Sequence, residues 1–168
     1  MNLLELFAPV RTFVFDVDGV LTDGNLMLTE DGHMLRSMSI KDGYAIQLAI
    51  KKGYRVWIIS GGKSDAVRLR LSKLGVNEIH TGIESKKEIL HDIVLASNSE
   101  YNSVLYMGDD IPDYAAMKVC GLPCCPNDAV AEIKQIAKYI SPFAGGKGCV
   151  RDVIEKVMKL NGDWDLPA

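Results

Sequence analysis

The chain has 168 residues, of which 48% are hydrophobic and 24% are charged, and its formal net charge is −3. This length suits one domain with a hydrophobic core of its own, so residues 1–168 are expected to form a single domain. The slightly negative charge argues against nucleic acids and anionic membranes as partners, and an anionic substrate would have to be met by local positive charge.

The N-terminal stretch MNLLELFAPVR lacks the basic start and the sustained apolar run of a signal peptide. No apolar run elsewhere approaches the ~20 residues that span a bilayer. We therefore expect a cytoplasmic location and no membrane association. The four cysteines fit that location, because their arrangement suits neither a disulfide framework nor a zinc site.

Strand-like runs and helical patterns alternate along the chain. Continuous apolar runs predict buried strands at residues 12–16, 55–60, 103–107 and 122–125, with weaker signals around Ile79 and at 139–140. Helical spacing of apolar residues predicts helices at residues 42–52, 64–74, 85–96, 112–119, 128–137 and 150–160. This alternation predicts an α/β fold with a doubly wound, mostly parallel sheet.

Residues 24–38 depart from this alternation. Two short strand-like runs, LMLT and MLRSM, flank the turn residues Glu30, Asp31 and Gly32. Such a pattern predicts a small β-hairpin with a glycine-containing turn, which would form a flap beside the sheet.

The residues that follow the predicted strands are the candidates for a functional site, because ligands of open parallel sheets bind beyond the carboxyl ends of the strands. These candidates, together with a lysine that begins a helix, are Asp16, Asp18, Ser60, Gly61, Lys86, Asp109, Asp110 and Asp113. Carboxylates that leave an apolar strand are costly unless a cation joins them. Without His or Cys in the set, a hard cation is expected, and Mg²⁺ fits best because it also takes water and substrate phosphate.

The remaining groups in this set indicate phosphoryl transfer. A short hydroxyl followed by a glycine turn lets backbone N–H groups approach a phosphate closely, and a lysine adds positive charge. A carboxylate can serve as the nucleophile of such a reaction. Two other interpretations fit less well: Gly19 comes too early for an EF-hand calcium loop, and a P-loop would need glycine where Trp57 stands.

In this order, the motifs DxDGxxTD at 16–23 and GDDxxD at 108–113, with the strand-ending Ser60 and the helix-starting Lys86 between them, resemble the haloacid dehalogenase superfamily of phosphatases. The resemblance implies a Rossmann-like sheet. It also implies that Asp16 is the nucleophile. Asp18 would be the general acid and base, and would offer its backbone carbonyl to Mg²⁺. Asp109 would be a further metal ligand.

The same resemblance implies roles for the other candidates. Ser60 would bind the transferring phosphoryl group, with Gly61 beside it, and Lys86 would neutralise that group. Asp113 would orient Lys86 or a metal-bound water, and Asp110 would support the site in a similar way. The two stretches that separate Asp18, Ser60 and Lys86 are too short to hold a cap domain in addition to the predicted hairpin, helices and strand.

The finer pattern resembles a capless family, the 3-deoxy-D-manno-octulosonate 8-phosphate (KDO 8-phosphate) phosphatases, over nearly the whole chain. The likeness includes the hairpin, KDGY at 41–44, residues 67–75, GGKG at 145–148 and Arg151. It implies hydrolysis of KDO 8-phosphate in lipopolysaccharide sugar biosynthesis. It also implies a homotetramer that is built by the hairpin, with sites near the subunit interfaces.

Such a substrate carries a carboxylate, for which the resemblance makes Arg70 the first candidate and Lys147 the second, although the family usually has Arg where Lys147 stands. Simpler roles compete: Arg70 as a solvated helix residue, Asp42 as a cap of its own helix, and 145–148 as a flexible loop. Two other functions stay open. One is a phosphatase for a nine-carbon 2-keto-3-deoxy sugar acid 9-phosphate of the sialic-acid type, and the other is a non-catalytic sugar-phosphate-binding subunit.

Overall fold

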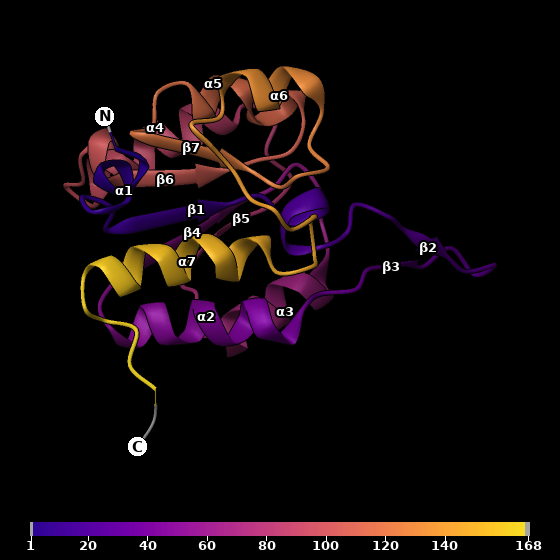
Figure 1. The fold of residues 1–168 in the computed structure, drawn as a ribbon. Helices are drawn as coiled ribbons and strands as arrows, with labels where there is room; N and C mark the ends of the chain where they lie inside the picture. The colour runs from indigo at the N-terminus through magenta and orange to yellow at the C-terminus, as the bar shows by residue number, and fades with distance from the viewer. Residues whose placement is uncertain (1, 167–168) are drawn as a thin grey trace.

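Six parallel strands form the central sheet of the computed structural model, which describes residues 2–166 (Figure 1). The strands are β1 (Thr12–Phe15), β4 (Arg55–Ile59), β5 (Glu78–His80), β6 (Val104–Met107), β7 (Leu122–Cys125) and β8 (Tyr139–Ile140). Their order across the sheet is β5-β4-β1-β6-β7-β8, and every pairing is parallel. The chain order reverses at β1, which therefore lies centrally.

The central strands are apolar on both faces because each face is covered by helices. Phe13 and Phe15 of β1 belong to one hydrophobic core, and Val14 between them belongs to the other. Ile58 and Trp57 of β4 divide between the two cores in the same way. Successive side chains point to opposite faces of the sheet, and both faces are buried. The sequence therefore shows continuous apolar runs rather than an alternation of apolar and polar residues.

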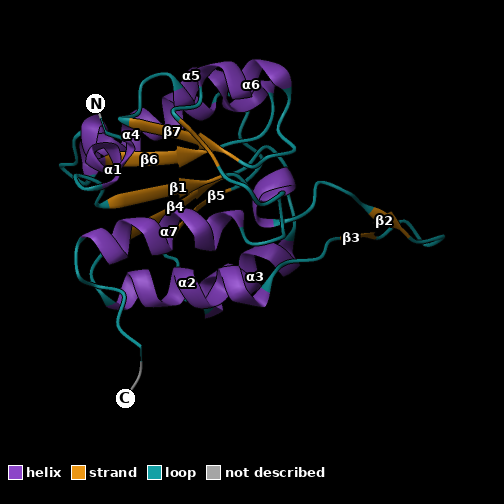
Figure 2. Cartoon of the chain, viewed as in Figure 1, coloured by secondary structure: helices purple, strands orange, loops and turns teal. Residues whose placement is uncertain are grey.

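The helices lie in two layers, as a doubly wound sheet requires (Figure 2). One layer contains α1 (Leu3–Phe7), α2 (Ile40–Lys51), α3 (Asp65–Lys73) and α7 (Cys149–Leu160), and the other contains α4 (Lys86–Ala96), α5 (Tyr114–Met117) and α6 (Ala131–Ile136). Leu71 and Val153 pack in the first layer, and Leu90 and Met117 in the second. The predicted α/β, doubly wound, Rossmann-like fold is confirmed.

Several predicted boundaries shift. The helix expected at 112–119 is a single 3₁₀ turn, η3 (Ile111–Asp113), followed by the short α5, and proline stands in the first turn of η3. The helix expected at 128–137 begins only at Ala131. The short helix α1 was not predicted, although Asn2 accepts a hydrogen bond from the backbone of Leu4 as a cap.

The predicted hairpin is present and projects away from the sheet (Figure 1). Its strands are β2 (Met27–Leu28) and β3 (Met34–Leu35), joined by a turn in which Gly32 has a positive φ of 88°. A bridge between Thr22 and Met38 closes its base. Apart from this hairpin, only a wide turn and α2 lie between β1 and β4, and only α3 and β5 lie between β4 and α4, so no cap domain is inserted in these stretches.

Two further expectations concern membranes and cysteines. Among residues 2–166, no helix combines the length and the apolar character that a bilayer crossing needs. All four cysteines are free and buried, and Cys124 and Cys125 lie on β7 as small core residues.

Asp42 does not cap its own helix, contrary to the simpler interpretation of the sequence. Ser39 caps α2, and its hydroxyl accepts a bond from the backbone N–H of Asp42 at 3.4 Å. The carboxylate of Asp42 instead accepts the N–H of Arg151 at 2.9 Å, in the first turn of α7, whose own cap residue Gly148 has no side chain to offer. Burial raises the pKa of Asp42.

Replacing Asp42 with Ala should therefore destabilise the fold by about 1–2 kcal/mol, because α7 loses its only side-chain cap within the described structure. Replacement with Asn should cost less, since the amide oxygen keeps the cap. Asn also avoids the cost of a buried charge, which grows as pH rises through the raised pKa of Asp42. Urea unfolding at neutral pH measures both variants, and equal losses would contradict the capping role.

Candidate active site

The first motif leaves β1 as a loop that only glycine allows. After Asp16 the chain makes a wide helical turn, η1 (Val17–Leu21), closed by a bond from the N–H of Thr22 to the carbonyl of Val17 at 3.0 Å. Gly19 has a φ of 89°, and a Cβ built there would lie 1.9 Å from Oδ2 of Asp109. The two acidic motifs therefore meet where Gly19 has no side chain.

One cavity of about 270 Å³ collects the residues that the sequence predicted from separate strand ends. It is lined by Asp16, Asp18, Gly24, Ser60, Gly61, Gly62, Lys86, Asp109, Asp110, Pro112 and Asp113. These residues follow β1, β4 and β6 or begin α4. The expectation that the carboxyl ends of these strands share one site is met by this arrangement.

Lys86 lies at the floor of this cavity and is only 3% exposed. Its Nζ lies 3.0 Å from Oδ1 of Asp16 and 2.7 Å from Oδ1 of Asp113. Burial alone would lower the pKa of Lys86, but the carboxylates of Asp113 and Asp16 outweigh it and raise that pKa. The lysine therefore stays charged, and it links the motif at 16–23 to the motif at 108–113.

Both carboxylate oxygens of Asp113 accept hydrogen bonds from neighbouring residues. Besides Lys86, the hydroxyl of Tyr106 donates to its Oδ1 at 2.9 Å, and the backbone N–H of Asp109 donates to its Oδ2 at 3.2 Å. With both oxygens engaged, this carboxylate is suited to orienting Lys86 and the loop that carries Asp109.

Asp16 and Asp109 are carboxylates whose charged forms are disfavoured by their surroundings. Burial, and then the nearby charge of Asp113, raise the pKa of Asp16 well above its usual range. Burial, then Asp113 and Asp110, raise the pKa of Asp109 to about 7. Oδ1 of Asp109 is buried and has no hydrogen-bond partner within residues 2–166. Lys86 alone does not offset the buried charge of these acids, so a second cation would lower the cost of burying them.

A divalent cation fits this cluster. Oxygens of Asp16, Asp109 and Asp113 lie within 4.8 Å of one another. All are hard oxygen ligands, which Mg²⁺ prefers. Because both oxygens of Asp113 already accept hydrogen bonds, Asp16 and Asp109 are the better ligands of the three. The carboxylate of Asp18 is not part of this group.

Ser60 and the two glycines after it form the turn that leaves β4. Ser60 is buried, its backbone N–H donates to the carbonyl of His80 at 2.8 Å, and its hydroxyl accepts the N–H of Gly62 at 3.3 Å. Gly61 and Gly62 leave this part of the cavity without side chains. The turn thus offers a hydroxyl at close range to the acids.

The structure adds one residue that the sequence argument missed. Arg36, just after β3, donates from Nε to Oδ1 of Asp18 at 2.7 Å and from Nη2 to Oδ2 at 3.3 Å. A sequence signal existed, because a hairpin whose base closes between Thr22 and Met38 must return residue 36 close to the loop that carries Asp18. In the sequence alone, Arg36 is simply one residue of the strand-like run MLRSM.

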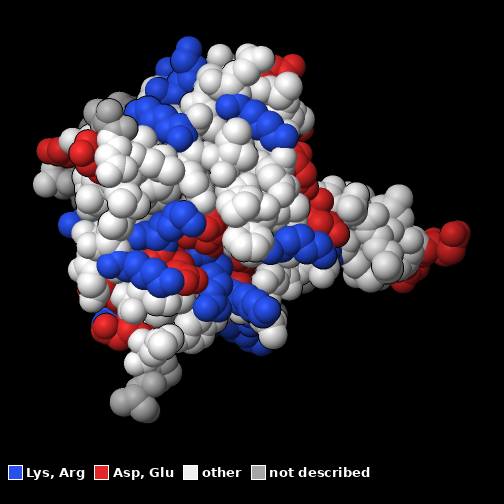
Figure 3. Space-filling model, viewed as in Figure 1, with Lys and Arg blue, Asp and Glu red and all other residues white. Residues whose placement is uncertain are grey.

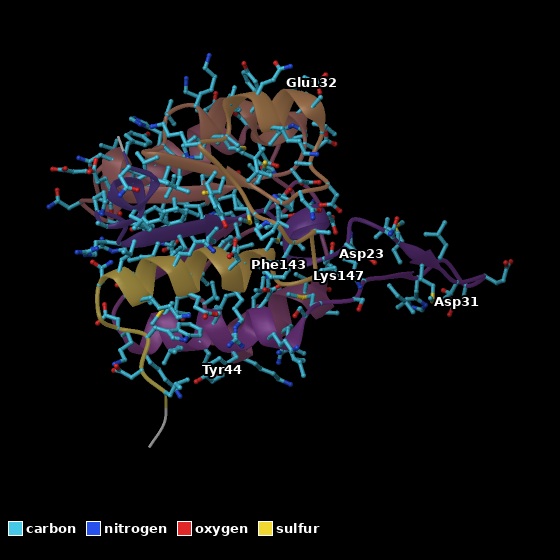
Figure 4. All side chains as sticks on the ribbon, in the orientation of Figure 1. Asp23, Asp31, Tyr44, Glu132, Phe143 and Lys147 are labelled. Carbon is cyan, nitrogen blue, oxygen red and sulfur yellow. The ribbon has the colours of Figure 1, made fainter. Side chains whose placement is uncertain are left out.

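Arg70 and Lys147 do not line the catalytic cavity within one chain. Arg70 lines a separate groove of about 340 Å³ between α3 and the hairpin base, together with Arg36 and Met38. Lys147 lies on the loop before α7 and lines another cavity, of about 520 Å³, with Phe143 (Figure 4). Basic side chains gather on this face over α7 and α2 (Figure 3).

Comparisons with known proteins agree with this arrangement, although no family model matches the chain. The 3-deoxy-D-manno-octulosonate 8-phosphate phosphatase KdsC of Escherichia coli K12 is 32% identical over 156 residues, which are 93% of this chain and 83% of that protein. A crystal structure of the enzyme of that name from Yersinia pestis has a TM-score of 0.93 and 28% identity, over 96% of this chain and 87% of the other.

A second crystal structure carries ligands. It is the 3-deoxy-D-manno-octulosonate 8-phosphate phosphatase of Moraxella catarrhalis in complex with a magnesium ion, a phosphate ion and KDO. Its TM-score is 0.91, with 28% identity over 94% of this chain and 91% of that chain. The identity and the coverage decide the family: this chain belongs to the KdsC family of KDO 8-phosphate phosphatases, within the haloacid dehalogenase superfamily.

Proposed function

We propose that this protein is a Mg²⁺-dependent phosphomonoesterase that hydrolyses KDO 8-phosphate to KDO and phosphate, in the cytoplasm, as a step of lipopolysaccharide sugar biosynthesis. The observation that carries the proposal is the buried Lys86, which joins Asp16 to Asp113 in the cavity that also contains Asp109. The enzyme names of the relatives support the choice of substrate. Residues 1–168 would form the single catalytic domain of each subunit.

Asp16 is the nucleophile in this proposal. The backbone N–H of Val17 at 2.7 Å and Nζ of Lys86 at 3.0 Å both contact its Oδ1, so Oδ2 is the oxygen left to attack. Attack on phosphorus forms an aspartyl-phosphate as the bond to the sugar oxygen breaks. Asp18 gives its proton to that leaving oxygen and later takes one from the water that hydrolyses the aspartyl-phosphate.

The other groups bind and orient the phosphate. The hydroxyl of Ser60 and the backbone of Gly61 contact the phosphoryl oxygens, and Lys86 offsets their charge. Asp16, Asp109 and the backbone carbonyl of Asp18 would hold Mg²⁺, which neutralises the negative charge that develops in the transition state. Asp110 and Asp113 support these ligands.

The open cavity and the hairpin support assembly into a homotetramer with sites near the subunit interfaces. The hairpin exposes a run of large apolar side chains, which are Leu26, Met27, Leu28, Met34 and Leu35. Exposed apolar surface of this kind marks a protein contact. In such an assembly a neighbouring subunit would cover the cavity, and Arg70 or Lys147 would bind the carboxylate of the sugar acid.

A panel of sugar phosphates, assayed with Mg²⁺, tests the substrate. We expect the highest kcat/KM on KDO 8-phosphate and a loss of roughly 10³-fold or more in kcat for Asp16→Asn, which removes the nucleophile. Asp31→Asn, at the exposed hairpin tip, is the control. A higher kcat/KM on a nine-carbon keto-acid 9-phosphate would show that KDO 8-phosphate is not the preferred substrate. Binding without hydrolysis of any phosphate would favour a non-catalytic subunit.

Affinity for Mg²⁺ should fall as pH drops below 7, because the raised pKa of Asp109 means that protons compete with the cation there. Where one proton is displaced, the fall is about tenfold per pH unit. Calorimetry in two buffers of different protonation enthalpy counts the released protons. Asp109→Asn should abolish both binding and release, and Asp31→Asn should change neither. An affinity independent of pH would remove Asp109 from the ligand set.

The assembly is tested by one charge on the hairpin. Leu28 is 70% exposed, and Leu28→Glu should prevent burial of the hairpin in a subunit interface and give a monomer by light scattering. Leu95→Glu, on the exposed face of α4, is the matched control and should leave the tetramer intact. A parent protein that is already monomeric would refute the proposed assembly.

A further inference from the structure

Arg36 stands at the foot of the hairpin, and its environment differs from that of the strand before it. Met34 and Leu35 are exposed, whereas only 10% of the Arg36 side chain is exposed. A guanidinium has five N–H donors and is seldom enclosed without acceptors. Arg36 finds them on Asp18, with donor–acceptor distances of 2.7 and 3.3 Å, and at the carbonyl of Met34 at 3.5 Å.

This two-point pairing occupies both oxygens of Asp18. In the proposed function, which this inference takes as its basis, one of those oxygens must face the leaving oxygen of the substrate. Each oxygen keeps a second lone pair, but a carboxylate that turns toward the leaving oxygen no longer matches the two donors of the guanidinium, so at least one bond to Arg36 weakens. A guanidinium freed in this way, and still enclosed, needs another acceptor nearby.

The cavity itself is short of positive charge. Five carboxylates line it, those of Asp16, Asp18, Asp109, Asp110 and Asp113, and Lys86 is its only Lys or Arg. Lys86 is already shared between Asp16 and Asp113. A phosphate that enters brings further negative charge. Even with Asp18 protonated as the general acid, the lysine and one divalent cation do not balance the other four acids and the phosphate. An additional cation beside the phosphate would therefore strengthen binding.

Arg36 is that nearby cation. A Cβ placed on Gly62 would lie 3.5 Å from Nη2 of Arg36 and 3.8 Å from the hydroxyl of Ser60. The guanidinium thus lies beside the same turn that offers Ser60 to the phosphate. Because residue 62 is glycine, no side chain stands between them.

We propose that Arg36 is a phosphate-binding residue that is paired with Asp18 before substrate binds and moves its N–H groups onto the phosphoryl oxygens of the bound substrate. The hairpin thereby contributes directly to binding of the phosphate. Bidentate contact between Arg and phosphate is geometrically favourable, since two parallel N–H groups match two oxygens. The exchange also releases Asp18 when the phosphate has arrived.

Inorganic phosphate, titrated by calorimetry into the full-length protein with Mg²⁺, tests this role without turnover. We expect Arg36→Gln to raise the Kd for phosphate about tenfold or more, the factor given by loss of a charge-assisted hydrogen bond. Arg55→Gln is the matched control, because Arg55 lies at the amino-terminal end of β4, away from the strand ends that line the cavity, and donates to Ser99. An unchanged Kd for Arg36→Gln would overturn the proposal.

A double-mutant comparison separates direct contact from an indirect effect of charge. Without Arg36, an unpaired Asp18 would repel phosphate, which would also weaken binding. We therefore expect the tenfold loss to persist when Arg36→Gln is combined with Asp18→Asn and compared with Asp18→Asn alone. If the loss vanishes in that background, Arg36 acts only by neutralising Asp18, and the proposal is wrong.

If thermal melting shows that Arg36→Gln unfolds, Arg36→Met, which keeps the apolar length of the side chain, carries the same comparison. The result is also independent of the sugar. Weaker phosphate binding in the variant with no hydrolysis of KDO 8-phosphate by the parent would support Arg36 and reject the proposed substrate, whereas the reverse pattern would reject Arg36 alone.

Discussion

The site depends on one buried interaction, the contact of the Lys86 ammonium with two carboxylates that come from different strand ends. A buried ion pair is not a strong source of stability, because desolvation of its members offsets most of their attraction. Removal of one member is costly, however, since an uncompensated charge remains. The contact therefore acts as a geometric constraint: β1 and β6 must end, and α4 must begin, at positions that bring Asp16, Asp113 and Lys86 together. The sheet register supplies those positions, with Phe15 opposite Met107 at the ends of β1 and β6.

Close backbone packing provides the second constraint. Gly19 gives room to Asp109, and a Cβ on Gly145 would lie 2.0 Å from the carbonyl oxygen of Gly19. The N–H of Gly146 donates to the carbonyl of Val20 at 2.9 Å. The loop before α7, whose first turn Asp42 caps, thus packs against the turn that follows Asp16. Glycines at these positions let the loops pack closely, and this close packing fixes the positions of the acids.

The sequence predicted what depends on local pattern and on a general rule of parallel sheets. Apolar runs indicate where the strands are, and the rule that the carboxyl ends of parallel strands lie at one edge of the sheet groups Asp16, Ser60 and Asp109. What it could not predict depends on contacts between distant segments. Asp42 caps a helix more than a hundred positions away, and Arg36 reaches Asp18 only because the hairpin folds back. The positions of Arg70 and Lys147 relative to the cavity of the same chain belong to this class too, since neither follows a strand end.

The hairpin joins the domain only at its base, where Thr22 bridges Met38. Its strands β2 and β3 form a sheet of their own and do not pair with the six-stranded sheet. Insertions or deletions near Gly32 would therefore leave the strand register untouched, because both ends of the arm remain anchored. Such an arm can be lengthened, shortened or exchanged as a unit during evolution or in the laboratory. Related proteins could then differ in the range of substrates that they accept, while the residues at the strand ends stay the same.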